Sequence, residues 1–149
     1  MADPRAFVSF DYDHDNDWKV MFAGQSDSKS PTPFTVSDWS SKTVLPEAEW
    51  EKLIEAKIKN VNMLIVLVGT HMSTATGVNK EIQFAIDANV PIFGVYVNGG
   101  STTSTLPTGL ARSRTVTWTW TNVSNMIDTV MKEGKNNSLN ASIRASFWG

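Results

Sequence analysis

The chain has 149 residues, of which 41% are hydrophobic and 19% charged, and this size and composition are typical of one globular domain. We therefore expect a single domain over residues 1–149, without disulfides, thiolate catalysis or cysteine-ligated zinc, because the sequence contains no cysteine. The 13 basic and 15 acidic side chains give a formal net charge of −2, which argues against a nucleic-acid partner bound through a basic face.

In chain order, short apolar runs alternate with longer amphipathic stretches. The apolar runs predict β-strands at residues 6–10, 34–36, 63–68, 92–97 and 115–121. The amphipathic stretches predict α-helices at residues 17–23, 46–59, 78–88 and 123–132. The third and fourth runs are apolar on both faces, which is typical of strands covered by helices on both sides. The fifth run alternates Val116, Trp118 and Trp120 with threonines, which predicts an edge strand with one exposed face.

Alternating strands and helices favour an α/β protein. We predict a flavodoxin-like three-layer sandwich with a central, mostly parallel five-stranded sheet. Ligands of open parallel sheets bind outside the carboxyl ends of the strands. The segments expected to contain the site are therefore residues 11–17, 38–41, 69–77 and 98–105.

The acidic run at residues 11–17 is the most conspicuous local feature. It does not fit an EF-hand, because counting from Asp13 places Trp18 at the position for glycine and Gly24 at that for glutamate. Its carboxylates would repel a phosphate, which argues against an FMN-binding loop here. We expect Asp13, Asp15 and Asp17 to act as helix caps and dipole partners, and Asp11 to face the site.

Other chemistries find little support in the sequence. His14 and His71 lack further ligands for zinc and are expected at the surface or as caps. A response-regulator receiver is disfavoured because Gly69 and Thr70 stand where its phosphate-accepting aspartate would end the third strand. From the residues alone, Glu81 is expected to be a surface residue of its helix, on the flank of the buried stripe.

Five stretches, in this order and spacing, carry a family resemblance. They are residues 5–12 (RAFVSFDY), 37–40 (SDWS), 66–70 (VLVGT), 78–82 (VNKEI) and 91–95 (PIFGV). Together they resemble the TIR-like domains of bacterial defence proteins, in particular the Thoeris antiphage TIR subunits and the MTH538 TIR-like domains. The resemblance covers roughly residues 5–100 and implies a TIR-like fold.

This resemblance implies an enzyme of the NAD glycohydrolase or ADP-ribose cyclase type, with NAD as substrate and neither cofactor nor metal. Glu81 occupies the position of the family's catalytic glutamate, and a fixed anion there suits an oxocarbenium-like transition state. An aromatic wall for the departing nicotinamide is expected from Phe10 or Trp39. Residues 37–42 would correspond to the family's BB loop. The residues expected to bind the substrate are Phe10, Asp11, Asp38, Trp39, Ser40, Gly69 and Thr70.

The resemblance also implies partners. A TIR subunit of this kind is similar to a signal synthase, which would activate a downstream effector protein through a cyclic or conjugated ADP-ribose messenger. Self-association into a homo-oligomer and docking of the apolar tail at residues 143–149 are further expectations. Since no secretory leader and no membrane-spanning run is visible, we expect a cytoplasmic protein without a membrane partner.

Two alternatives stay open. Many relatives carry a tryptophan four residues before the glutamate, whereas this chain has Gly77, and that departure favours a non-catalytic TIR interaction module. A nucleoside 2-deoxyribosyltransferase-like enzyme would have a related sheet and a nucleophilic glutamate.

Overall fold

The computed structural model describes residues 4–26, 28–39, 46–72 and 76–134. The described chain forms one five-stranded sheet in the order β2-β1-β3-β4-β5, and every neighbouring pair of strands is parallel. The strands are β1 (Arg5–Ser9), β2 (Thr35–Trp39), β3 (Met63–Val68), β4 (Ile92–Tyr96) and β5 (Thr115–Thr117). The helices are α1 (Tyr12–Gln25), α2 (Glu47–Lys59), α3 (Thr76–Asp87), α4 (Trp120–Glu133) and the short η2 (Arg112–Arg114).

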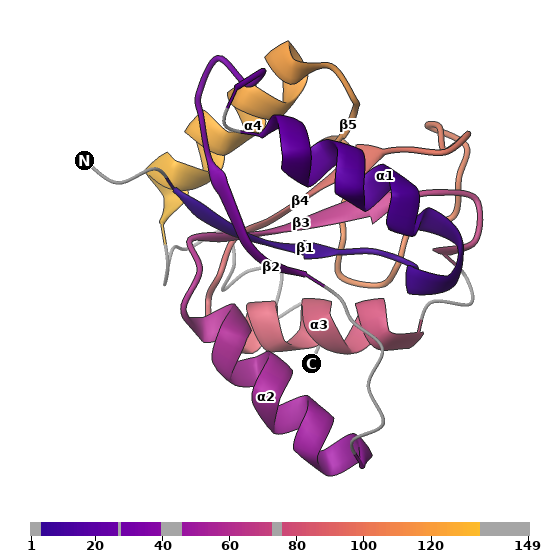
Figure 1. Ribbon diagram of the computed structural model, residues 1–149, viewed down its shortest axis with the longest axis vertical. Coiled ribbons are helices and arrows are strands. Elements are labelled where there is room, and N and C mark those ends of the chain that lie inside the picture. The colour runs from indigo at the N-terminus through magenta and orange to yellow at the C-terminus, as the bar shows by residue number, and fades with distance from the viewer. Residues whose placement is uncertain (1–3, 27, 40–45, 73–75, 135–149) are drawn as a thin grey trace.

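Helices α1 and α4 lie on one face of the sheet, and α2 and α3 lie on the other (Figure 1). This arrangement confirms the predicted flavodoxin-like α/β sandwich, with a sheet that is parallel throughout. The chain goes from β1 to β2 on one side and continues from β3 to β5 on the other. The strand order therefore reverses between β1 and β3, which is where ligands bind in folds of this kind.

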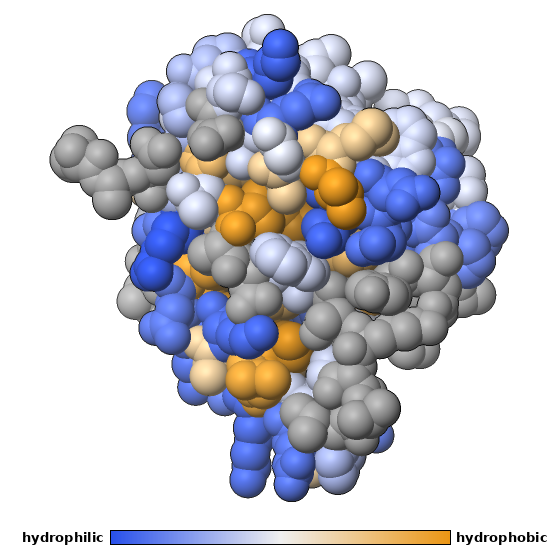
Figure 2. Space-filling model, viewed as in Figure 1, coloured by the Kyte–Doolittle hydropathy of each residue, from blue (hydrophilic) through white to orange (hydrophobic). Residues whose placement is uncertain are grey.

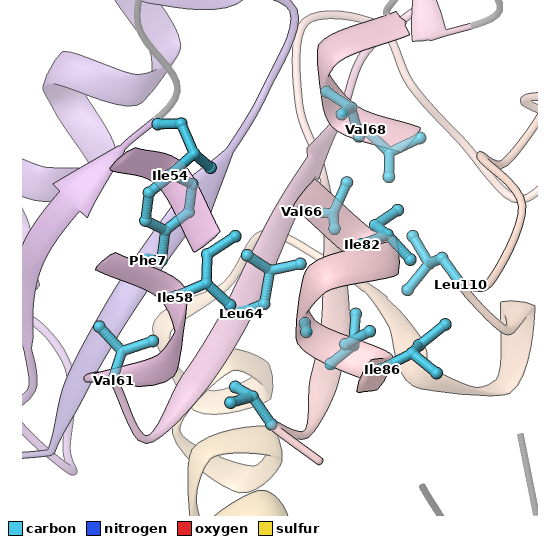
Figure 3. Close-up of a cluster of buried hydrophobic side chains, with 14 of the residues drawn as sticks. Phe7, Ile54, Ile58, Val61, Leu64, Val66, Val68, Ile82, Ile86 and Leu110 are labelled. Atoms are coloured by element: carbon cyan, nitrogen blue, oxygen red, sulfur yellow. The ribbon is translucent and has the colours of Figure 1, made fainter. Parts of the chain in front are cut away.

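Alternate residues of the strands build two separate cores. Toward α2 and α3, side chains of β1 and β3 such as Phe7 and Leu64 pack against Ile54, Ile58 and Ile82 (Figure 3). The second core, toward α1 and α4, contains Ala6, Val8, Phe10, Phe22, Phe34, Met63, Ile65, Leu67, Phe93, Val95, Val97, Val123, Ile127 and Val130. Burying each large apolar side chain stabilises the fold by roughly 1.5–3 kcal/mol, which explains why β3 and β4 have no polar face.

The fifth strand is shorter than predicted. It is an edge strand as expected, but it ends at Thr117, and Trp118 and Trp120 are not part of it. The reason is a helix cap: Thr119 Oγ1 accepts a hydrogen bond of 3.1 Å from the backbone N–H of Asn122, so α4 begins at Trp120. Both tryptophans instead join Phe22 in an aromatic cluster between α1 and α4, with ring centroids 5.2–5.7 Å apart.

The acidic run at residues 11–17 is helical from Tyr12 onward. Helix α1 begins at Tyr12, five residues before the predicted start at Asp17, because the Asp11 carbonyl accepts hydrogen bonds from the N–H groups of His14 and Asp15. Similarly, β2 continues through Asp38 to Trp39, so residues 37–39 belong to a strand and not to the predicted BB loop. The rest of that loop and the tail at residues 143–149 lie outside the described residues.

Apolar side chains also reach the surface. Figure 2 shows patches of hydrophobic residues on the face viewed in Figure 1, separated by hydrophilic ones. The exposed large apolar residues of α1 and β2 include Val20, Met21 and Trp39. Trp39 ends β2, so part of this apolar surface lies at the carboxyl edge of the sheet.

Candidate active site

Glu81 is buried and is held by the end of the first strand. It is 1% exposed, and its Oε1 accepts a hydrogen bond of 2.7 Å from Ser9 Oγ, which is itself fully buried. The surface position expected from the residues alone is therefore wrong. Since α3 packs over β1, the flank of its apolar stripe meets the last residue of that strand instead of solvent. The glutamate therefore lies at the carboxyl end of β1, beside the reversal of strand order.

Ser9 is a site residue that sequence reasoning missed. It is the one polar residue in the apolar run of β1, and it points to the α2 and α3 face together with Phe7. A hydroxyl at a buried strand position needs a hydrogen-bond partner, and this was the signal available in the sequence. The identity of that partner, 72 residues away, could not be read from local patterns.

The two histidines stack on each other above this edge. The rings of His14 and His71 lie 3.7 Å apart and are nearly parallel, at 7°. His14 Nδ1 lies 2.7 Å from Asp11 Oδ2, and Thr70 Oγ1 lies 3.3 Å from His71 Nδ1. The contacts join the start of α1 to the segment after β3, so the structure brings the expected residues Asp11 and Thr70 together. Within the part of the chain that the structure describes, no three metal-ligating side chains are grouped to bind a metal ion.

Asp15 is buried against Gly69 within the first turn of α1, so the expectation that it caps the helix is wrong. It is fully buried, and its Oδ1 accepts a hydrogen bond of 2.9 Å from Asn98 Nδ2. A Cβ atom at position 69 would lie only 2.5 Å from Asp15 Oδ2, so this approach requires glycine. Burial raises the pKa of Asp15, against the lowering effect of the Asn98 hydrogen bond. The absence of a side chain at Gly69 therefore leaves room for the Asp15 carboxylate.

Lys19 reaches the same edge on the opposite face of β1, and sequence reasoning missed it as well. Its Nζ lies 4.3 Å from the ring centroid of Trp39 and 5.8 Å from that of Phe10. The residue is only 8% exposed, and burial lowers the pKa of its ammonium group. The wall expected from Phe10 or Trp39 for nicotinamide therefore already faces a cation.

A hollow of about 360 Å³ lies outside the carboxyl ends of β3 and β4. It is lined by Thr70, Met72, Gly99, Ser101, Thr103, Ser104 and Thr105. Arg112 supports its rim by donating hydrogen bonds to the carbonyls of Thr102 and Ser104. Of the expected substrate-binding residues that the structure describes, only Thr70 lines this hollow, and Glu81 does not.

The remaining expected residues lie on β2 and α3. Asp38 and Trp39 are the last two residues of β2, whereas Ser40 lies outside the described residues. Gly77 is within the first turn of α3, and the Trp50 indole of α2 lies 3.9 Å from where its Cβ would be. The neighbouring helix thus supplies an aromatic ring beside the position at which many relatives carry tryptophan.

A comparison with protein-family models identifies the family. The model described as the TIR-like domain of the Thoeris protein ThsB matches residues 7–102. The chain belongs to this family. The matched segment of this TIR-like domain extends from β1 past β4 and includes both Ser9 and Glu81. It is thus a TIR-type protein of the antiphage Thoeris group, as the resemblance implied.

A search among curated proteins found no match to this TIR-like domain. None of the described helices has the length and apolar character needed to span a membrane.

Proposed function

We propose that this TIR-like domain cleaves NAD between nicotinamide and ribose, with Glu81 as the catalytic carboxylate. The observation that carries the proposal is the hydrogen bond of 2.7 Å that holds the buried Glu81 carboxylate at the carboxyl end of β1. A carboxylate held in a water-poor site interacts more strongly with a developing positive charge than one in solvent. Membership of the Thoeris TIR-like family supports this role.

The chemistry needs one bond to break. The bond between ribose C1′ and the nicotinamide nitrogen breaks, and its electron pair leaves with the nitrogen, so that nicotinamide departs neutral. The positive charge moves to C1′ and the ring oxygen, where Glu81 stabilises it. Water then adds its oxygen to C1′ and releases a proton, giving ADP-ribose. If a hydroxyl of the same or another nucleotide adds instead, the product is a cyclic or conjugated ADP-ribose.

The proposed product is a messenger. We favour capture of the ADP-ribosyl group by a hydroxyl, which gives a nucleotide that binds a downstream effector protein. The enzyme would act in the cytoplasm and would need no cofactor, since NAD is the substrate. The expected substrate contacts from Phe10, Asp11 and Gly69 belong to this proposal, as does self-association into a homo-oligomer.

Access to Glu81 requires a local opening. A carboxylate on a residue that is 1% exposed does not touch a ribose until the structure around it opens. Activity should therefore depend on an activating signal or on substrate binding that stabilises the open form. Assays on resting protein alone would underestimate the activity.

The test compares matched variants. Purified protein is incubated with NAD, with and without extract from phage-infected cells, and free nicotinamide is measured. Glu81→Gln should abolish release while circular dichroism shows an intact fold. Glu55→Gln removes a carboxylate from an exposed pair with Lys59 on α2 and should leave release unchanged. Equal release from Glu81→Gln and wild type would refute the proposal.

The second candidate is an interaction module without catalysis. The burial of Glu81 favours this non-catalytic role, since a carboxylate that is hydrogen-bonded to Ser9 can also serve only to stabilise the fold. Release of nicotinamide by neither wild type nor variant under activating conditions would support this role. Supplying deoxynucleosides in the same assay tests the nucleoside 2-deoxyribosyltransferase alternative, which predicts base exchange and no reaction with NAD.

A further inference from the structure

Lys19 stands out among the charged residues because it is nearly buried. Among the side chains that the structure describes, no carboxylate forms an ion pair with its Nζ. Lysines are almost never this buried unless they are paired. Its contacts are the rings of Phe10 and Trp39, which compensate only part of the lost hydration. The site therefore holds a positive charge that a ligand could neutralise.

The ammonium group is not completely sealed from solvent. Lys19 Nζ is not among the described side-chain atoms that are sealed from solvent without a hydrogen bond. The stem of the side chain is covered, and the neighbouring Trp39 is 39% exposed. An anion that reaches the ammonium would therefore do so beside the exposed indole of Trp39.

The placement relates Lys19 to Glu81 through β1. Ser9 and Phe10 are consecutive residues and point to opposite faces of the sheet, since one belongs beside the α2 and α3 core and the other lies in the α1 and α4 core. Glu81 accepts a hydrogen bond from Ser9, and the ammonium of Lys19 lies over the ring of Phe10. A ligand crossing the carboxyl end of β1 after the local opening that uncovers Glu81 would therefore meet a carboxylate on one side and an ammonium on the other.

We infer that Lys19 and Trp39 form an anion site that binds the diphosphate of the nucleotide substrate. This inference rests on the proposed function, because NAD combines a ribose that becomes cationic with a diphosphate that is anionic. Glu81 suits the first group and Lys19 suits the second. The nicotinamide ring then lies away from Trp39, since the ammonium already occupies the face of that indole.

Binding of inorganic pyrophosphate tests the site without any turnover. Calorimetric titration of wild type should give saturable binding that weakens as salt is raised. Lys19→Met keeps the apolar stem and removes the charge, and it should weaken pyrophosphate at least tenfold. Lys19→Arg should retain binding, and Lys29→Met, which removes an exposed charge, should bind like wild type. Equal affinities of Lys19→Met and wild type would overturn the inference.

A second measurement on wild type guards against a folding defect in the variant. Reductive methylation followed by mass spectrometry should show Lys19 protected by pyrophosphate and by ADP-ribose, but not by adenosine, which has no phosphate. Protection of Lys19 no greater than that of Lys29 would also overturn the inference. Both measurements can also be made on the Glu81→Gln variant, in which no NAD is cleaved. Loss of the anion site and loss of NAD cleavage can therefore be told apart.

Discussion

Ser9 and Glu81 lie 72 residues apart in the chain and are joined by a buried hydrogen bond of 2.7 Å. This bond connects the last residue of β1 with the middle of α3, so the position of the carboxylate depends on the packing of that helix on the sheet. Since a buried carboxylate without a donor is costly, the hydroxyl both stabilises the fold and sets the direction of the Glu81 side chain.

Removing the Ser9 hydroxyl should therefore affect stability and activity together. Ser9→Ala is expected to lower the free energy of unfolding by about 1–3 kcal/mol, because it leaves a buried carboxyl oxygen of Glu81 without its donor. It should also slow nicotinamide release. Ser9→Thr retains a hydroxyl and should restore part of both. Urea unfolding and a nicotinamide assay measure the two effects, and a Ser9→Ala protein as stable and active as wild type would contradict this role.

A methyl group at position 69 should not be tolerated. Gly69→Ala places a Cβ only 2.5 Å from Asp15 Oδ2, and forcing the carboxylate away is expected to cost roughly 1–3 kcal/mol. Gly24→Ala is the matched control, because no atom lies within 4 Å of its added Cβ and alanine favours the helix. Chemical denaturation should separate the two variants. Similar stabilities would mean that Asp15 moves aside freely.

Asp15 should make stability fall as pH rises. Burial raises its folded-state pKa above the unfolded value, so the folded protein holds a proton more tightly in the interval between them. Below the unfolded-state pKa the carboxyl of Asp15 is protonated in both states, so burying it costs no charge. Above the folded-state pKa it is ionised in both states, and the free-energy cost of burying the charge acts in full. Asp15→Asn can still accept the hydrogen bond from Asn98 and should gain stability over wild type between about pH 4 and about pH 7. Parallel denaturation at both pH values checks this, and a loss over that interval would contradict it.

The bidentate pair of Arg114 with Glu133 should matter more than exposed pairs. Arg114 donates hydrogen bonds of 2.8 and 2.7 Å to the two Glu133 oxygens and another of 2.8 Å to the Ile92 carbonyl. These contacts tie the end of η2, directly before β5, to β4 and α4. Arg114→Lys keeps the charge but loses this geometry, and it should cost about 1–3 kcal/mol.

The exposed pair of Lys59 with Glu55 provides the control for Arg114. It spans one helical turn of α2 at 3.0 Å, and Lys59→Met should change stability by at most about 0.5 kcal/mol. Thermal or urea unfolding of the two variants side by side measures the difference. A cost for Lys59→Met equal to that of Arg114→Lys would show that the bidentate geometry adds nothing.

The fold followed from local patterns, but parts of the site did not. The doubly apolar runs of β3 and β4 could belong only to strands covered on both faces, and the order of elements then implied the parallel sheet. The start of α1 was misplaced because a run of aspartates is typical of a loop, whereas here Asp15 has a buried niche at Gly69. The strand at residues 115–121 was too long because a threonine that caps a helix resembles one in a strand.

Among Glu81, Ser9 and Lys19 at the candidate site, one was predicted from the sequence and two were missed. Glu81 was predicted to be catalytic from the resemblance, although its own neighbours in the sequence indicated a surface position. Ser9 and Lys19 were missed because their partners are distant in the chain, and tertiary packing alone brings a hydroxyl to Glu81 and an ammonium to Trp39.

The most direct test of the account is mass spectrometry of NAD reacted with the activated protein. We predict that free nicotinamide and an ADP-ribose-derived product accumulate together with wild type, and that neither forms with a folded Glu81→Gln variant. Intact NAD throughout the wild-type reaction, or the same products at the same rate from the variant, would contradict the claim that the carboxylate held by Ser9 drives the cleavage.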